Sequence, residues 1–198
     1  MTYEYTDKVI KAINRYSIEK FSNLKSKLSI DELNSLENVR KVHAELQIFV
    51  RKMYIALANF VYKSDFGGKE LTRLLDEVWL DETLDGYDPV VKYVFNNEVE
   101  RKQARLFEAI MGSTNPGTEI DAALRSWVLM TSEFAVRVAD NAHLQALQDL
   151  GVNRVKWVSE KDNKVCRVCY KRDGKIYPLF AIPPKPHMNC RCHVERVK

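Results

Sequence analysis

The residues of this chain best suited to chemistry are its cysteines, all four of which lie among the last 33 residues. Cys166 and Cys169 are separated by two residues, and after a 17-residue gap come His187, Cys190 and Cys192. A two-residue spacing lets a tight backbone turn direct two ligand atoms at one cation, and two such pairs complete the tetrahedron that Zn²⁺ prefers. The spacing therefore predicts one structural zinc site.

Five donors compete for the four positions of such a site. Cys166 and Cys169 form one pair, and His187 with Cys190 repeats the same two-residue spacing. A Cys-x-Cys pair sharing one metal is less usual, so Cys192 is the alternative to either of the later two donors. We predict Cys166, Cys169, His187 and Cys190 as the zinc ligands.

The alternative interpretation of the cysteines is two disulfides or four free thiols. The segment after Met1 is polar and mixed in charge, unlike a cleavable export signal, and no run approaches the roughly 20 apolar residues that span a bilayer. Thiols made in a reducing cytosol bind metals or stay free more often than they pair. We therefore expect cytoplasmic synthesis, no membrane contact and metal binding.

Positive charge is concentrated around the cysteines. Residues 151–198 carry 12 Lys and Arg against 4 Asp and Glu, whereas residues 1–150 carry 19 against 23. Such a patch favours a phosphate-rich partner, with a solvated basic surface as the alternative. The residues predicted to contact DNA or another phosphate are Arg154, Lys156, Lys164, Arg167, Lys171, Arg172, Lys175 and Arg191.

The first 150 residues are expected to form a helical body, because apolar side chains recur at three- and four-residue intervals. Breaks are expected near residues 64–70 and 112–118. The expected helices are residues 7–28, a second from the Ser29–Glu32 capping box to Gly67, a short one ending near Trp79, a fourth from Pro89 to about Met111, and a last one from Glu119 to Gly151.

Local signals predict how these helices begin and end. Thr6 is a candidate cap for the first helix. Gly151 is expected to close the last helix in the left-handed conformation, with Val152 making the accompanying hydrophobic contact. We interpret His43 and His143 as ordinary helix residues rather than ligands.

The periodicity changes after Gly151, where Val155 and Trp157 alternate with basic residues as in a strand. Residues 192–197 form a second β-like run, on which His193 is expected to be exposed. The pair Asp173-Gly174 predicts a β-hairpin turn. Few apolar residues are present, whereas a structural zinc site contributes on the order of 10 kcal/mol of folding free energy. The predicted fold is mainly α: a long-helix body (1–150) followed by a small β-hairpin zinc module (151–198).

The carboxy-terminal blocks also resemble a known family. In order they are Trp157-Val158, Asp162, Val165-Cys166-x-x-Cys169, Asp173-Gly174-Lys175 and His187-Met188-Asn189-Cys190-Arg191-Cys192. They are similar to the signature of the phage Mu protein F-like minor head proteins, over residues 119–198. The family pattern has proline where this chain has Met188, and an Arg-Thr-Glu-like sequence where it has Ala139-Asp140-Asn141-Ala142, so no role attached to that sequence is carried over.

The resemblance implies a non-enzymatic minor capsid protein for head morphogenesis of a tailed phage or prophage. It would be made in the bacterial cytoplasm and lie in the virion, in the capsid interior or at the portal vertex. Its implied partners are the portal protein and capsid or scaffold components, with packaged double-stranded DNA as a candidate and no small-molecule substrate.

Enzyme classes are the competing interpretation. A zinc deaminase needs His-x-Glu upstream of Pro-Cys-x-x-Cys, and a zincin protease needs His-Glu-x-x-His; the sequence has neither. A zinc-stapled nuclease, with His187 or His193 as base, is the alternative function, although no carboxylate and Asn partners accompany these histidines. A cellular adaptor that binds nucleic acid or protein through a zinc module is a third interpretation.

Overall fold

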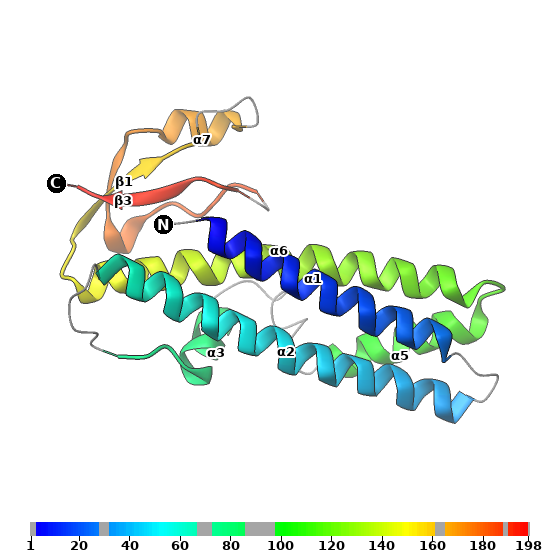
Figure 1. Ribbon diagram of the computed structural model, residues 1–198. Coiled ribbons are helices and arrows are strands. Elements are labelled where there is room, and N and C mark those ends of the chain that lie inside the picture. The colour runs from blue at the N-terminus through cyan, green and yellow to red at the C-terminus, as the bar shows by residue number, and fades with distance from the viewer. Residues whose placement is uncertain are drawn as a thin grey trace.

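The computed structural model describes residues 3–27, 32–66, 73–85, 98–160, 165–187 and 190–197. The fold is mainly helical, with 74% of the described residues in helices, and has a small antiparallel sheet at the C-terminal end. Long helices form a bundle, and the sheet and one short helix lie beside one end of it (Figure 1). The expected mainly α fold with a small carboxy-terminal β unit is confirmed in this respect.

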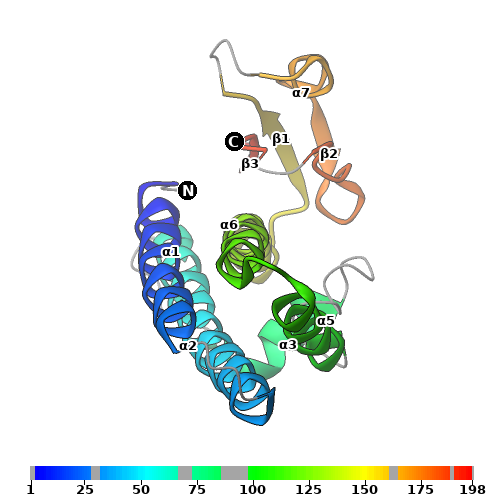
Figure 2. The same ribbon diagram turned by 90° about the vertical axis from the view of Figure 1, so that its right-hand side faces the viewer.

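Within the described ranges five helices make the bundle, and α6 is its central element. Helix α6 packs against α1, α2 and α5, and makes a smaller contact with α3. Viewed nearly along the helix axes, α6 lies between the α1–α2 pair and α5 (Figure 2). The helices are α1 (Tyr3–Ser26), α2 (Glu32–Phe66), α3 (Glu77–Asp85), α5 (Glu98–Gly112) and α6 (Pro116–Asp149).

The bundle core is apolar, and several of the polar groups that enter it are hydrogen-bonded. The hydroxyl of Tyr54 on α2 donates to the carbonyl of Thr131 on α6 at 2.7 Å. The indole Nε1 of Trp127 donates to Ser17 Oγ at 3.1 Å, and that hydroxyl in turn donates to the Ile13 carbonyl at 2.8 Å. These bonds tie α1 and α2 to α6 without leaving these buried donors unpaired.

Helix periodicity predicted the long helices well and their starts less well. Helix α1 begins at Tyr3, so the expectation that Thr6 caps it is wrong: Thr6 is a buried residue inside the helix. Helix α6 begins at Pro116 rather than near Glu119, because proline is well suited to the first turn of a helix. Ser29 and Pro89 lie outside the described residues.

The short helix lies further along the chain than expected. It was expected to end near Trp79, but α3 begins at Glu77, and Asp76 caps it by accepting a hydrogen bond from the Trp79 backbone N–H at 3.0 Å. The preceding residues are not helical, because the amide of Asn59 on α2 bonds both the N–H and the carbonyl of Leu75. These side-chain bonds replace the helical backbone bonds of that turn.

The C-terminal end of α6 closes as the sequence predicts. Gly151 has a φ of +72°, and its N–H donates to the Gln148 carbonyl at 2.9 Å. The N–H of Val152 donates to the Leu147 carbonyl at 2.9 Å, which completes a Schellman motif. This turn directs the chain from α6 into the first strand of the sheet.

The C-terminal unit is a three-stranded antiparallel sheet with a short helix. Strand β1 is central, and the strand order is β2-β1-β3. Val155 pairs with Tyr177 on one side and with Arg196 on the other. The elements are β1 (Arg154–Val158), α7 (Arg167–Arg172), β2 (Ile176–Pro178), the 3₁₀ turn η1 (Leu179–Ala181) and β3 (His193–Arg196).

The predicted β-hairpin at Asp173-Gly174 is wrong. The residues before this turn form α7 instead of a strand, and β2 pairs with β1. Gly174 still takes a left-handed conformation, with a φ of +73°, and its N–H donates to the Trp157 carbonyl at 2.9 Å. The turn signal was correct, but the Cys-x-x-Cys segment on its N-terminal side is helical.

A second hydrophobic cluster joins this unit to the bundle. Leu147 of α6 lies in it together with residues of the sheet and three of the cysteines. Its buried members are Leu147, Val155, Trp157, Cys169, Cys190, Cys192 and Val194. The C-terminal third of α6 is therefore shared by both parts of the molecule.

None of the helices in the described part of the chain combines the length and the apolar character needed to cross a bilayer.

Replacing Gly151 by alanine should lower the free energy of unfolding by about 1–2 kcal/mol, because a Cβ is strained at this positive φ. Gly112 is the matched control: it ends α5, has open space where a Cβ would lie, and should tolerate alanine or gain up to about 1 kcal/mol. Denaturant unfolding of both variants provides the measurement. Equal effects would show that the α6 closure does not depend on glycine.

Candidate metal centre

Five donor side chains gather beside the sheet as two groups of three that share one residue. Cys166, Cys169 and His187 form one group, and Cys169, Cys190 and Cys192 form the other; within each group the ligand atoms lie within 4.8 Å of one another. Cys169, Cys190 and Cys192 are buried, Cys166 is half-buried and His187 is exposed. Cys169 is therefore the centre of a cluster that could hold a metal ion.

Helix α7 positions the first pair of thiols. Cys166 is its N-cap, and the Cys166 sulfur accepts a hydrogen bond from the Cys169 backbone N–H at 3.3 Å. One helical turn thus brings the two sulfurs to the same side. Asp173 ends the helix and holds it to β1, because its carboxylate accepts from the Ser159 N–H at 2.8 Å.

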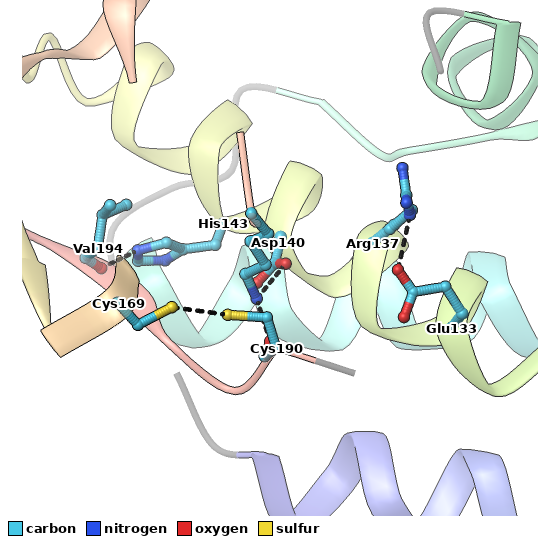
Figure 3. A network of polar contacts seen from close by, with 8 residues as sticks. Glu133, Arg137, Asp140, His143, Cys169, Cys190 and Val194 are labelled. Atoms are coloured by element: carbon cyan, nitrogen blue, oxygen red, sulfur yellow. Dashed lines mark hydrogen bonds and ion pairs between the residues drawn. The ribbon is translucent and has the colours of Figure 1, made fainter. Parts of the chain in front are cut away.

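The later donors come from the segment that leads into β3. The sulfurs of Cys169 and Cys190 lie 3.4 Å apart (Figure 3). This separation is well beyond a disulfide bond of about 2.05 Å, and all four cysteines are free thiols. The structure divides the predicted ligands between the two groups: Cys166, Cys169 and His187 lie in one, and Cys190 lies in the other with Cys169 and Cys192. Which four of the five bind remains a prediction.

An ion pair from α6 holds the loop that carries Cys190. Asp140 Oδ2 lies 2.5 Å from Lys185 Nζ, and the same Nζ donates to the Cys190 carbonyl at 2.9 Å (Figure 3). Both side chains are largely buried, at 18% and 23% exposure. The helix thus fixes the backbone of a donor residue through one lysine, which we call the Asp140–Lys185 clamp.

A second polar contact holds β3 to the bundle. His143 on α6 places Nδ1 2.7 Å from Asp65 Oδ2 on α2 and Nε2 2.8 Å from the Val194 carbonyl on β3. Both partners are acceptors, so only the imidazolium form donates to both. His143 therefore links three elements, α6, α2 and β3, through these two contacts.

The thiols differ in their surroundings. The pKa of Cys166 is lowered to about 7, chiefly because its sulfur accepts a backbone hydrogen bond from Cys169. Burial raises the pKa of Cys169 and of Cys190, and the positive charge of Lys185 opposes the rise at Cys190. The buried thiols therefore favour the neutral form unless a cation compensates their thiolate charge.

Asp140 is the carboxyl group near the cluster whose pKa is shifted most. Burial raises its pKa to about 6, while Lys185 and His143 act in the opposite direction. A buried carboxylate is costly without a partner, so the clamp lysine is what keeps this group charged near neutral pH.

A cavity of about 410 Å³ lies between α6 and the sheet, beside the donor cluster. Cys190 and Cys192 form part of its wall, together with Asp140, Trp157 and His193. His193 is largely buried there, with a side chain that is 16% exposed, so the expectation that it is exposed is wrong. Its strand was predicted correctly, but the proximity of α6 could not be read from the strand alternation.

The predicted phosphate contacts that the structure describes lie in different surroundings. Arg154 and Lys156 are exposed on β1, and Lys156 lies 3.7 Å from Glu195. The guanidinium of Arg172 lies 5.1 Å from the Trp157 ring centroid and donates to the Pro184 carbonyl at 2.7 Å, so Arg172 has a structural role. The other predicted contacts are exposed Arg167, Lys171, Lys175 and Arg191, and Lys164, which lies outside the described residues.

Sequence reasoning missed the residues that hold the donor segments in place. Asp140 and His143 lie three residues apart on α6, so they share a face, but nothing in the local sequence distinguishes that face from the rest of the helix. Lys185 lies between prolines in a segment expected to be an extended loop. Only the packing of α6 under the sheet reveals their roles.

Comparison with known proteins gives no further assignment: no family model, no curated protein and no solved structure matches this chain. The resemblance to phage Mu protein F-like minor head proteins accordingly depends on the sequence blocks alone.

The Asp140–Lys185 clamp should be measurable as a coupled pair. Asp140→Ala and Lys185→Met should each lower the free energy of unfolding by about 1.5–3 kcal/mol, since each leaves a largely buried charge unpaired. The double variant should lose less than the sum of the two. Denaturant unfolding measures all three.

The control for the clamp is the ion pair between Lys25 and Asp121. Its charged atoms lie 2.8 Å apart, but both side chains are about half exposed. Asp121→Ala should cost at most about 1 kcal/mol. Additive losses at Asp140 and Lys185 would contradict the clamp.

Proposed function

We propose that the cysteine cluster binds one structural Zn²⁺, and that the chain is a non-enzymatic minor head protein of a tailed phage or prophage. The observation that supports zinc binding is the convergence of two donor groups on Cys169. The head-protein half depends on the resemblance of residues 119–198 to the phage Mu protein F-like family. The two halves are tested separately.

The donor types support zinc. Thiolates with an imidazole are the donors of structural zinc sites, and three or four thiolate ligands leave no open position for a substrate. Zn²⁺ also compensates the charge that burial disfavours on Cys169 and Cys190. With Cys166, Cys169, His187 and Cys190 as ligands, the ion would connect α7 to the segment before β3.

The shape of the molecule fits a structural partner role. The bundle presents helices longer than 30 residues, α2 and α6, and the proposed zinc module lies beside the C-terminal end of α6. Helix surfaces of this kind offer docking faces for the portal protein and for capsid or scaffold components. The exposed basic residues on β1 and α7 are candidate contacts for packaged DNA.

The nuclease alternative has less support. Such an enzyme would need a catalytic metal in addition to the zinc that closes its fold. In the described ranges, the groups of three or more metal-binding side chains are the two that share Cys169. Plasmid DNA incubated with the protein and Mg²⁺ or Mn²⁺ should therefore remain intact, and nicking would favour the nuclease.

Removing the metal should unfold the module and leave the bundle folded. We expect close to one zinc per purified chain, and chelator with reductant should remove hydrogen-exchange protection from residues 154–196 while α1 and α2 keep theirs. Cys169→Ser should reproduce this loss because both donor groups need Cys169. Cys192→Ser, the control, should keep the metal if Cys192 is the spare donor. A metal-free chain with a protected module would contradict the zinc proposal.

The head-protein proposal is tested through its partners. The genes beside this one should encode a portal, a terminase and a scaffold or major capsid protein, and co-expressed portal should co-purify with the chain. Salt-sensitive, sequence-independent binding to double-stranded DNA is expected in a mobility-shift assay. A regulatory or metabolic gene neighbourhood, with no portal binding, would refute the assignment even if zinc is present.

A further inference from the structure

The C-terminal unit exposes large apolar side chains on α7, β2 and η1. Phe180 on η1 is 93% exposed and Tyr170 on α7 is 72% exposed, and Val168 and Ile176 are each 45% exposed. Helix α7 and strand β2 follow one another along the same side of the unit (Figure 2). A unit with so small a core leaves these side chains in water at a cost, unless another surface covers them.

Cations accompany these apolar residues. Arg167 and Lys171 lie on α7 and Lys175 precedes β2, and all three are exposed. Among the described residues, none of the salt bridges found involves these three side chains. We call the surface formed by residues 167–171 and 175–180 the basic edge.

Helix α3 carries the opposite combination. Leu74 just before it and Val78 within it are 66% and 64% exposed. Val78 and Glu82 lie four residues apart on one face, flanked by Glu77 and Asp81. Residues 73–85 contain five acidic residues and one arginine. We call this surface the acidic face.

The orientation of the segment that carries the acidic face is fixed by its packing. Leu75, Trp79 and Leu80 are buried on the opposite side of the same segment and anchor it to the bundle. Arg51 on α2 fixes its orientation by pairing with Asp81 at 2.8 Å and with Glu77. Glu77 and Asp81 remain more than half exposed, so the surface keeps its negative character.

The two surfaces cannot meet within one chain. Both views place α7 and α3 on opposite sides of α6 (Figures 1 and 2). A contact between them therefore requires two molecules, and it joins unlike surfaces, which makes it heterologous: each chain keeps one surface for a further neighbour.

We propose that the basic edge of one chain binds the acidic face of a second copy, so that the chain assembles head to tail. Each surface exposes apolar side chains, and the charges on the two surfaces are opposite in sign, so unlike surfaces attract and like surfaces repel. The proposal concerns a property beyond the proposed metal and head-protein roles and can fail or hold independently of them.

The direct test is sedimentation of the metal-loaded full chain over a range of concentrations and salt. We expect species larger than the 23.0 kDa monomer at low salt, and a weaker association as salt screens the flanking charges. A monomer at every concentration and salt would overturn the proposal.

Paired charge variants test the head-to-tail arrangement. The acidic-face variant Val78→Lys with Glu82→Lys, and the basic-edge variant Lys171→Glu with Lys175→Glu, should each associate at least about tenfold more weakly, because like charges would then face each other. Mixed together, the two variants retain one intact acidic face and one intact basic edge between them. They should therefore associate with each other more strongly than either variant associates with itself.

Matched controls carry the same changes elsewhere. Lys11→Glu with Lys52→Glu matches the basic-edge variant in charge, and Ile48→Lys with Glu37→Lys matches the acidic-face variant; all four residues are exposed on α1 or α2. Both controls should assemble as the parent does. Zinc content and helical circular dichroism of every variant report folding.

Two outcomes would refute the proposal even if the parent assembles. The first is a mixture of the two variants that stays monomeric. The second is a basic-edge variant that loses DNA binding in a mobility-shift assay but keeps parental self-association, which would make the edge a nucleic-acid surface.

Discussion

Among the residues that the structure describes, the C-terminal unit is held together by a cluster of seven buried residues, three of which are cysteines. A core of this size does not offset the entropy of ordering some 40 residues, so the thiols have to contribute more than their apolar area. Because the thiols converge on Cys169, they could do so by holding a metal ion together. The positions of α7 and β3 depend on that point, because α7 carries Cys169 and Cys192 immediately precedes β3.

Helix α6 is the second condition for this arrangement, since it serves the bundle and the C-terminal unit at once. Trp127 and Phe134 pack in the bundle core, whereas Leu147 lies in the cluster with the cysteines. Between these two regions, Asp140 and His143 reach the loop before Cys190 and the strand after Cys192. The segment carrying the later donors is therefore fixed at both ends by one rigid helix, which reduces the entropy lost when an ion binds.

The sequence predicted what local rules control, and it missed what tertiary packing controls. The long helices follow from apolar periodicity, and the closure at Gly151 follows from backbone sterics. The segment before Asp173 was expected to be a strand, yet the hydrogen bond from the Cys169 N–H to the Cys166 sulfur makes it a helical turn. The burial of His193 depends on which surface faces α6, and no periodicity within one strand carries that information.

The buried ion pairs show what the fold gains from polar contacts that are costly to desolvate. Replacing the Asp140–Lys185 clamp by apolar residues could leave stability unchanged, because the desolvation of two charges offsets much of their attraction. Apolar side chains would, however, leave the Cys190 carbonyl without its donor and the loop free to slide along α6. Because the lysine of this pair also bonds a backbone carbonyl, the loop can lie on α6 in one position only. The clamp therefore fixes the position of a donor atom rather than adding net stability. A metal site requires its donor atoms to be placed to within about half an ångström.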